Sequence, residues 1–231
     1  MAKKAWRKRQ HTEKYFKRAK AEGYRARSVY KFDEINKKFR LIKSGDVVLD
    51  LGAAPGSWSQ IAQKIVGKTG KVIAVDIQPM SPISGVTIIQ GDVRDPEVQQ
   101  HIRQQAEHHY FDAVISDIAP NTTGIPLADH ARSIELSLFA LATAIRWLRP
   151  GGNFITKVFQ GEDFPHLFKL TRRYFRQVKS VSPAATRKES KEIFMVAHGL
   201  RARADLDPHH GLMALLALSP QPVSGDESKG C

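Results

Sequence analysis

The chain has 231 residues, of which 42% are hydrophobic and 26% charged. This length accommodates one α/β domain with a short appendage, and the composition excludes wholesale disorder. The formal net charge is +13, and the single cysteine, Cys231, is the last residue, so an internal disulfide and a cysteine-based zinc site are excluded.

The first element predicted in chain order is a helix over 28–39 that follows a basic arm. Val29, Phe32, Ile35 and Phe39 recur there at helical spacing, and Ser28 is a candidate cap. Short β-branched runs then alternate with helical patterns. We expect strands at 47–52, 71–77, 86–92, 111–117, 153–159, 177–183 and 192–200, and helices at 57–66, 96–109, 130–148 and 164–175.

This alternation predicts a doubly wound α/β fold with a parallel core. The last two strands are separated by a short gap without a helical pattern, so we expect them to pair antiparallel. The expected fold is a Rossmann-like, seven-stranded, mostly parallel sheet with an antiparallel last strand. We divide the chain into a basic RNA-binding arm over 1–27, this domain over 28–203, and a partly disordered C-terminal tail over 204–231.

A glycine-rich turn follows the first predicted strand and opens the next helix, where doubly wound sheets bind nucleotides. Gly52 and Gly56 are four residues apart with Pro55 between them, which is not the G-x-G-x-x-G phosphate fingerprint. The glycines let a ligand approach the backbone, and Asp50 can accept from an ammonium group. These features suit S-adenosylmethionine, which has a cationic amino acid and a sulfonium but no phosphate. A generic strand–helix turn is the alternative.

Two further acids end the next two predicted strands. Asp76 comes 20 residues after Gly56, where an acid accepts from ribose hydroxyls. Asp92 ends the third strand and is placed to meet the exocyclic amine of an adenine. Each acid alone is more often a cap or a solvated residue. Acids at the ends of three strands beside a glycine turn favour a cofactor site.

Five segments carry a family resemblance: DLGAAPGSWSQ, AVDI, GDV, SDIAPN and KVFQG. In this order they resemble the bacterial ribosomal RNA large-subunit methyltransferase E family, also called FtsJ-like heat-shock methyltransferases, from about Arg25 to Gly199. The resemblance implies a class I S-adenosylmethionine-dependent methyltransferase that methylates the ribose 2′-oxygen of a uridine in 23S ribosomal RNA within the large (50S) subunit. The cofactor contacts that it implies are Gly56, Trp58, Asp76, Asp92 and Asp117.

Methylation of a ribose hydroxyl needs a base, because the hydroxyl is a very weak acid. Lys157 lies in an otherwise apolar strand, where a lysine is costly unless it is paired or exposed at the strand end. Asp117 ends the preceding strand, in SDIAPN. The resemblance implies a catalytic tetrad, which falls on Lys31, Asp117, Lys157 and Glu192.

Within this tetrad we expect Lys157 to accept the proton and Asp117 to orient Lys157. Lys31 is then a second cation that favours the neutral amine of Lys157 and helps to hold the ribose or a phosphate. Glu192 positions Lys31 or the hydroxyl. Glu189 is a rival three residues earlier, but the spacing to the apolar run EIFMVA favours Glu192.

The positive charge lies in two segments. Residues 1–40 contain 15 Lys and Arg against 4 acids, and residues 169–203 contain 10 against 2. Segments of one sign favour an RNA partner, and the aromatic residues of the arm could stack on bases. We interpret Phe16 and Tyr30 instead as core anchors of the arm. If the fold brings the two segments together, they form one positive surface.

Three alternatives compete with this interpretation. The first is a 2′-O-methyltransferase acting on transfer RNA, since its motifs are shared. The second is a non-catalytic RNA-binding ribosome-assembly factor, which would not need the tetrad. The third is a nicotinamide-dependent oxidoreductase, which the missing G-x-G-x-x-G and the +13 charge disfavour. Methylation of a base amine is also disfavoured, because SDIAPN lacks the second proline and the aromatic of that motif.

No metal is expected, because the nine histidines show no His-x3-His spacing and have no cysteine partners. No apolar run approaches the roughly 20 residues of a membrane span. The first residues, MAKKAWRKRQ, lack the apolar segment of a signal peptide. We therefore expect a cytoplasmic monomer without membrane contact.

Overall fold

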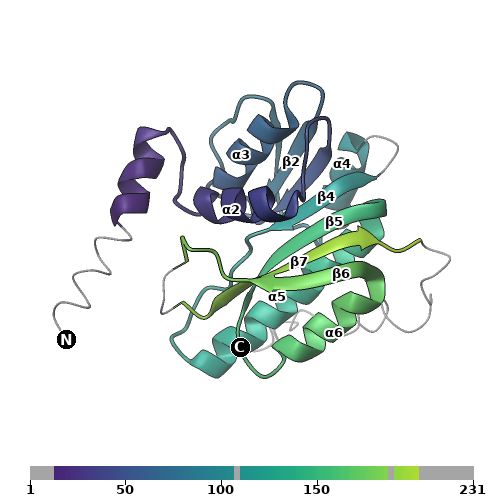
Figure 1. Cartoon of the computed structure of the whole chain (residues 1–231). Helices are drawn as coiled ribbons and strands as arrows, with labels where there is room; N and C mark the ends of the chain where they lie inside the picture. The colour runs from purple at the N-terminus through teal and green to yellow at the C-terminus, as the bar shows by residue number, and fades with distance from the viewer. Residues whose placement is uncertain (1–12, 107–109, 187–189, 203–231) are drawn as a thin grey trace, which may run out of the picture.

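The computed structural model describes residues 13–106, 110–186 and 190–202 (Figure 1). Its strands are β1 Val47–Leu51, β2 Lys71–Asp76, β3 Val86–Gln90, β4 Phe111–Ser116, β5 Leu148–Phe159, β6 Phe175–Val181 and β7 Glu192–Leu200. Its helices are α2 Val29–Phe39, α3 Ser57–Val66, α4 Pro96–Gln105, α5 Pro126–Trp147 and α6 Phe164–Tyr174. A further helix, over 13–21, precedes α2.

All seven strands form one sheet in the order β3-β2-β1-β4-β5-β7-β6. The strands from β3 to β5 are parallel, and β7 runs antiparallel to both of its neighbours, β5 and β6. The predicted mostly parallel sheet with an antiparallel last strand is therefore confirmed. The strand order reverses between β1 and β4, and the carboxyl ends of strands on either side of such a reversal form the crevice in which open α/β sheets bind ligands.

The sheet is covered by helices on both faces, which is why its central strands are largely apolar. Successive residues of a strand point to opposite faces. Val48 and Val72 accordingly pack with α2 and α3, while Leu49 and Ile73 pack with α4, α5 and α6. The helix that carries Lys31 and the helix that begins at the glycine turn thus lie on the same face of the sheet.

Several boundaries differ from the sequence prediction. Helix α5 begins at Pro126 rather than at residue 130, since proline is tolerated in the first turn of a helix. The preceding loop is held by Asp129, which accepts from the backbone N–H groups of Thr123 at 2.7 Å and Gly124 at 3.2 Å. The helix ends at Trp147 and β5 follows at once, five residues earlier than the predicted strand at 153–159.

Ser28 does not cap α2 with its side chain, and its hydroxyl instead lies 2.8 Å from the hydroxyl of Ser57 at the start of α3. Strand β3 ends at Gln90, so Asp92 lies in the turn after the strand rather than at its last residue. Strand β6 begins at Phe175, directly after α6, two residues before the prediction.

The N-terminal arm is described from residue 13 onward, where a helix packs on α2. Tyr15 and Ala19, one turn apart, face the domain, and the Tyr15 ring lies 5.5 Å from that of Tyr30. Tyr30 is 7% exposed, which confirms it as an anchor. Phe16 is 61% exposed, so its predicted role as a core anchor is wrong. The side of the helix that faces the domain carries Tyr15 and Ala19 instead.

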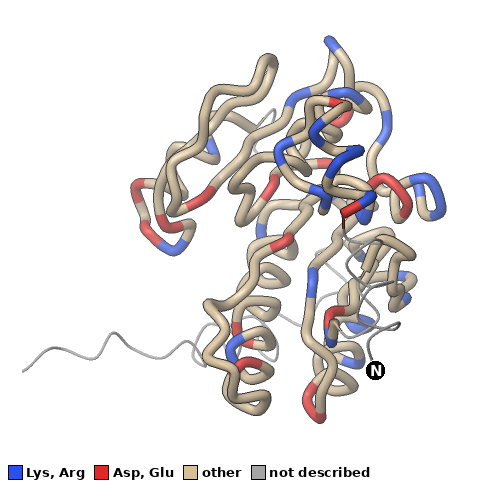
Figure 2. The backbone as a smooth tube through the Cα atoms, turned by 90° about the vertical axis from the view of Figure 1, so that its left-hand side faces the viewer, with Lys and Arg blue, Asp and Glu red and all other residues tan. Residues whose placement is uncertain are grey.

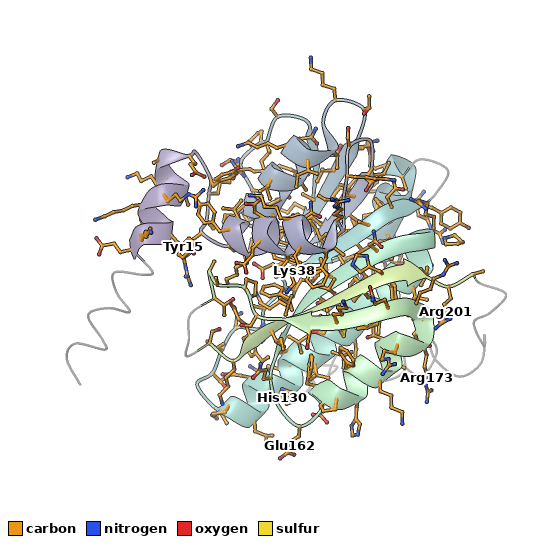
Figure 3. The ribbon with its side chains drawn as sticks, in the orientation of Figure 1. Tyr15, Lys38, His130, Glu162, Arg173 and Arg201 are labelled. Carbon is orange, nitrogen blue, oxygen red and sulfur yellow. The ribbon has the colours of Figure 1, made fainter. Side chains whose placement is uncertain are left out.

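The helix over 13–21 and helix α6, which carry parts of the two basic segments, do not form one positive surface. The segments do meet elsewhere, because the ring of Phe39 at the end of α2 lies 6.2 Å from that of His198 in β7. Figure 2, in which the helix over 13–21 faces the viewer, shows Lys and Arg gathered along it. Tyr15 on this helix and the pair Arg173 and Arg201 lie on opposite sides of the molecule (Figure 3). The cause is the strand order, which places α6 on the face of the sheet opposite α2.

The remaining predictions about segments fall outside the described residues. These are the tail over 204–231, the first 12 residues of the arm, and Glu189, the rival to Glu192.

Candidate active site

The first pair of predicted site residues joins the ends of two parallel strands. Ser116 of β4 lies beside Thr156 of β5, so the next residues along, Asp117 and Lys157, are neighbours. Lys157 Nζ donates to Asp117 Oδ1 at 2.8 Å and to the Asp117 carbonyl oxygen at 2.7 Å. The two side chains are 10% and 19% exposed, so this lysine is buried and paired, as an apolar strand requires.

Helix α5 holds the end of β5 from the other face. The Ser137 hydroxyl donates to the Lys157 carbonyl oxygen at 3.0 Å, and the Ser133 hydroxyl accepts from the Phe159 N–H at 2.9 Å. Gly161, the last residue of KVFQG, follows the strand, and a Cβ there would lie 2.5 Å from the His130 ring. Close packing against α5 therefore explains the glycine of this motif, and it fixes the backbone that carries Lys157.

The second pair, Lys31 and Glu192, joins α2 to the start of β7. Lys31 Nζ donates to Glu192 Oε1, and the side chains are 8% and 11% exposed. Burial alone would raise the pKa of Glu192, but the charge and hydrogen bond of Lys31, together with the charge of Lys157, outweigh burial and hold that pKa below its usual value. Glu192 is therefore an ionised carboxylate at neutral pH.

The two pairs are adjacent on one face of the sheet. In the antiparallel register of β5 and β7, Lys157 pairs with Phe194 and Phe159 pairs with Glu192. Residues two apart on a strand share a face, so Lys157 and Glu192 both point toward α2. Lys31 Nζ also lies 5.9 Å from the centre of the Phe194 ring. The tetrad predicted from the sequence is thus assembled from α2, β4, β5 and β7.

The glycine turn lies at the carboxyl end of β1, next to this edge. Gly52 has φ +67° and Gly56 has φ +105°, both in the left-handed region that favours glycine. A Cβ on Gly52 would lie 2.3 Å from Ile118, and one on Gly56 would lie 2.6 Å from Ile83. Both positions therefore need glycine, because the conformation and the space each exclude a side chain.

Asp50 is fully buried beneath the turn. Its Oδ2 accepts from the Ser59 hydroxyl at 2.6 Å, and its Oδ1 accepts no hydrogen bond from any residue of the described chain. Burial first, and then the nearby carboxylates of Asp117 and Asp76, raise the pKa of Asp50 to about 8. A buried carboxyl with one oxygen unused fits a cationic ligand group, and the amino group of S-adenosylmethionine is one.

The acid at the end of β2 and the acid that follows β3 differ in their surroundings. Asp76 accepts from the backbone N–H of Ala54 at 2.8 Å and of Gln78 at 2.7 Å, so it ties the glycine turn to the loop after β2. Asp92 is bonded by the guanidinium of Arg94, at 2.9 Å from Nε and 2.5 Å from Nη2, and these bonds lower its pKa. Arg94 was missed in the sequence, although it stands only two residues from Asp92.

Trp58 places its side chain in the core rather than at the turn. It is 2% exposed, its ring stacks on Phe32 at 4.8 Å, and its Nε1 donates to the Ser28 carbonyl oxygen at 3.0 Å. Only the backbone N–H of Trp58, in the first turn of α3, is left to contact a cofactor there. The indole itself anchors α2 to α3, which positions Lys31.

Two classes of feature are not found among the residues that the structure describes. No group of three or more His, Cys, Asp or Glu side chains there could hold a metal ion. No helix there is long and apolar enough to span a membrane.

The sheet order and the crevice at the switch between β1 and β4 define the class I S-adenosylmethionine-dependent methyltransferase fold. S-adenosylmethionine is the cofactor of this class. The solved structure of Aeropyrum pernix fibrillarin with natively bound S-adenosylmethionine shares the fold, with a TM-score of 0.50 and 19% identity over 68% of each chain. A Plasmodium falciparum protein assigned as a ribosomal RNA methyltransferase matches with a TM-score of 0.70 and 27% identity, over 78% of this chain and 100% of its own.

The chain belongs to the FtsJ-like methyltransferase family, whose model matches residues 24–200. It is 48% identical to the ribosomal RNA large subunit methyltransferase E of Syntrophobacter fumaroxidans, over 81% of this chain and 95% of the relative. It is 45% identical to the protein of the same name from Chromobacterium violaceum, over 85% of this chain and 96% of that relative. The family resemblance of the five sequence segments is therefore confirmed.

Proposed function

We propose that this protein transfers a methyl group from S-adenosylmethionine to the ribose 2′-oxygen of a uridine in 23S ribosomal RNA, within the large ribosomal subunit. The observation that carries the proposal is the buried ammonium group of Lys157, held by two oxygens of Asp117 at the carboxyl ends of β4 and β5. The names of the two bacterial relatives support a large-subunit ribosomal RNA as the substrate.

In the proposed reaction Lys157 is the proton acceptor. When bound, S-adenosylmethionine supplies a methyl group on a positively charged sulfur. As the new O–C bond forms, the bond between the methyl group and the sulfur would break, with its electron pair left on the sulfur of S-adenosylhomocysteine. The ribose O–H bond breaks in the same step, and the proton goes to the lone pair of neutral Lys157 Nζ. The Asp117 carboxylate and carbonyl then stabilise the ammonium that results, in the geometry seen here.

Lys31 and Glu192 are the second functional pair. Lys31 adds a positive charge near Lys157 that can hold a ribose or phosphate oxygen of the RNA. Glu192 keeps Lys31 in place through their buried ion pair. The rest of the rate acceleration comes from proximity, because the strand ends hold the ribose hydroxyl in line with the methyl donor.

The cofactor lies, in this proposal, along the edge from β1 to β3. Gly52 and Gly56 let it approach the backbone, and the unused oxygen of Asp50 accepts from its amino group. Asp76, the last residue of β2, then contacts the ribose, and Asp92, which follows β3, contacts the adenine. The further contacts are the backbone of Trp58 and the carboxylate of Asp117.

RNA contacts are assigned to the helix over 13–21. Its exposed side includes Lys14, Lys17 and Lys20, with the exposed ring of Phe16 among them. Cations contact phosphates without regard to sequence, and an exposed aromatic ring can stack on an unpaired base.

The test is a methyl-transfer assay with labelled S-adenosylmethionine and three RNAs: intact large subunits, bare ribosomal RNA and transfer RNA. The product is digested with nucleases, and the label is mapped to a nucleoside. Label on a 2′-O-methyluridine from the large subunit supports the proposal, and Lys157→Ala is the matched negative control.

Three other results would point elsewhere. Label on transfer RNA alone would favour the transfer RNA alternative. Label on a base would overturn the 2′-O assignment. No label on any RNA, with RNA binding intact, would favour the non-catalytic assembly factor.

A further inference from the structure

Arg25 belongs by sequence to the basic arm, but its guanidinium donates hydrogen bonds to backbone carbonyl oxygens of the domain. Nη1 donates to the carbonyl oxygen of Pro55 at 2.9 Å and to that of Ser81 at 2.8 Å, and Nη2 donates to that of Pro82 at 2.8 Å. These carbonyls belong to two loops. Pro55 is in the glycine turn after β1, and Ser81 and Pro82 are in the loop between β2 and β3.

The segment around Arg25 is itself fixed to α3. The backbone N–H of Arg25 donates to Gln60 Oε1 at 3.0 Å, and Gln60 Nε2 donates to the Gly23 carbonyl oxygen at 3.0 Å. Gln60 thus fixes the backbone on both sides of Tyr24 to α3. The Arg25 side chain therefore starts from a fixed backbone position when it bonds the glycine turn and the β2–β3 loop.

Arg25 also packs directly on the glycine turn. A Cβ on Gly56 would lie 3.0 Å from Arg25 Nη1 and 2.6 Å from Ile83 Cδ1. The same turn is also held by Asp76, which accepts from the Ala54 N–H. Two side chains therefore fix the turn, the carboxylate at the end of β2 and the guanidinium from the arm.

We propose that Arg25 is a positioning residue for the cofactor: it locks the glycine turn against the β2–β3 loop and so preorganises the S-adenosylmethionine site. This rests on the cofactor placement given above. A planar guanidinium suits the task, because its fixed fork of donors can bond several carbonyls at once, whereas the ammonium of a lysine is a compact point charge. A ligand binds more tightly to loops that are already ordered, since less conformational entropy is lost.

An alternative role for Arg25 is electrostatic attraction of RNA. Substitution of a neighbouring lysine distinguishes this role from positioning of the cofactor site. A cavity of about 520 Å³ along α3 is lined by Arg25, Lys64 and Lys68, among others. Lys68 is exposed, and no hydrogen bond or ion pair joins it to another described residue. Lys68→Ala therefore removes one positive charge from the same cavity without releasing either loop.

The experiment measures the Kd of S-adenosylmethionine without RNA for the wild type, Arg25→Ala, Arg25→Lys and Lys68→Ala. We expect Arg25→Ala to weaken binding at least about tenfold, which corresponds to about 1.4 kcal/mol. Arg25→Lys keeps the charge but loses the fork, so its Kd should also rise. Lys68→Ala should bind the cofactor like the wild type. In methyl transfer, the KM for S-adenosylmethionine should rise in both Arg25 variants, with kcat at saturation within about twofold.

Unchanged cofactor Kd in Arg25→Lys would overturn the proposal, because that variant keeps the charge and removes only the bracing geometry. Equal losses of RNA affinity in Arg25→Ala and Lys68→Ala, with cofactor Kd unaltered, would likewise assign Arg25 to RNA attraction. Because the Kd is measured without RNA, this outcome is independent of which RNA, and which atom of it, is methylated.

Discussion

Lys157 donates from one ammonium group to two oxygens of the same residue, the Oδ1 of Asp117 at 2.8 Å and its carbonyl oxygen at 2.7 Å. The carbonyl belongs to the backbone at the end of β4, so the lysine stays anchored even when the carboxylate is changed. Because of these two hydrogen bonds, we expect substitutions of Lys157 and of Asp117 to have different effects on activity.

Lys157→Ala should abolish methyl transfer, a loss of at least about 10²–10⁴-fold in kcat, because the proton acceptor is removed. Cofactor affinity should stay near that of the wild type. Asp117→Asn should be less severe in kcat, since the carbonyl still holds the amine. Single-turnover assays together with calorimetric titration of S-adenosylmethionine provide the measurement, and near-normal turnover by Lys157→Ala would refute the base assignment.

Glu192→Gln should destabilise the protein in a pH-dependent way. The pKa of Glu192 is lowered in the folded state, so its contribution to stability is present at neutral pH and is lost as the pH falls through that lowered value. The variant leaves Lys31 buried without its partner. Its Tm should therefore lie well below that of the wild type at pH 7, and the two should converge in acid. Glu162→Gln, at an exposed acid, is the control, and a gap that stays constant with pH would contradict the assignment.

Asp50→Asn should stabilise the protein at higher pH. The pKa of Asp50 is raised to about 8, so the folded state binds its proton more tightly than the unfolded chain does. The wild type therefore loses stability as the pH rises from the unfolded value toward about 8, and the variant does not. Thermal melts between pH 5 and 8 should show a growing advantage for the variant.

The same substitution should weaken the binding of S-adenosylmethionine by about tenfold or more, a loss of about 1.4 kcal/mol. An ammonium group beside Asp50 favours the carboxylate, so cofactor binding at pH 7 should release a proton from the wild type but not from the variant. Calorimetry in two buffers with different heats of ionisation measures this proton. Equal release by both proteins would show that Asp50 does not meet the amino group.

Gly56→Ala should lose cofactor binding, because a Cβ at this left-handed position would clash with Ile83 and press on Arg25. Gly151→Ala is a matched control: Gly151 has φ +81°, and its Cβ would meet nothing closer than Arg149 Nη1 at 3.6 Å. Both variants carry the backbone strain of about 1–2 kcal/mol, but only Gly56→Ala should raise the cofactor Kd. Equal Kd values in the two variants would remove the turn from the cofactor site.

Phe16→Leu should weaken RNA binding by about fivefold to 150-fold if one base stacks on this ring, from about 1–3 kcal/mol per stacked base. Phe16→Trp keeps an aromatic face and should bind like the wild type. Since the side chain is 61% exposed, neither change should alter the Tm. The readout is the Kd for a fragment of the RNA that is methylated, and equal affinity of both variants would mean that the ring makes no stacking contact.

The sequence by itself determined the order of the elements and the edge at which the chemistry lies. Asp50, Asp76 and Asp117 come at or directly after the ends of apolar strands, and parallel strands bring their carboxyl ends to one edge. Lys157 was conspicuous for a similar local reason, as a charge in a run that had to be buried. Such features depend on periodicity and on neighbours in the chain, and both are visible in the sequence.

Only the tertiary structure decided which distant residues meet. Lys31 and Glu192 are 161 residues apart in the chain. They pair because α2 packs on the face of the sheet toward which Glu192 of β7 points. Arg25, counted with the basic arm in the sequence, proved to brace the glycine turn. Arg173 fell on the far side of the molecule because the strand order places α6 behind the sheet. Composition assigns charge to a segment, but strand order and register determine what each charge touches.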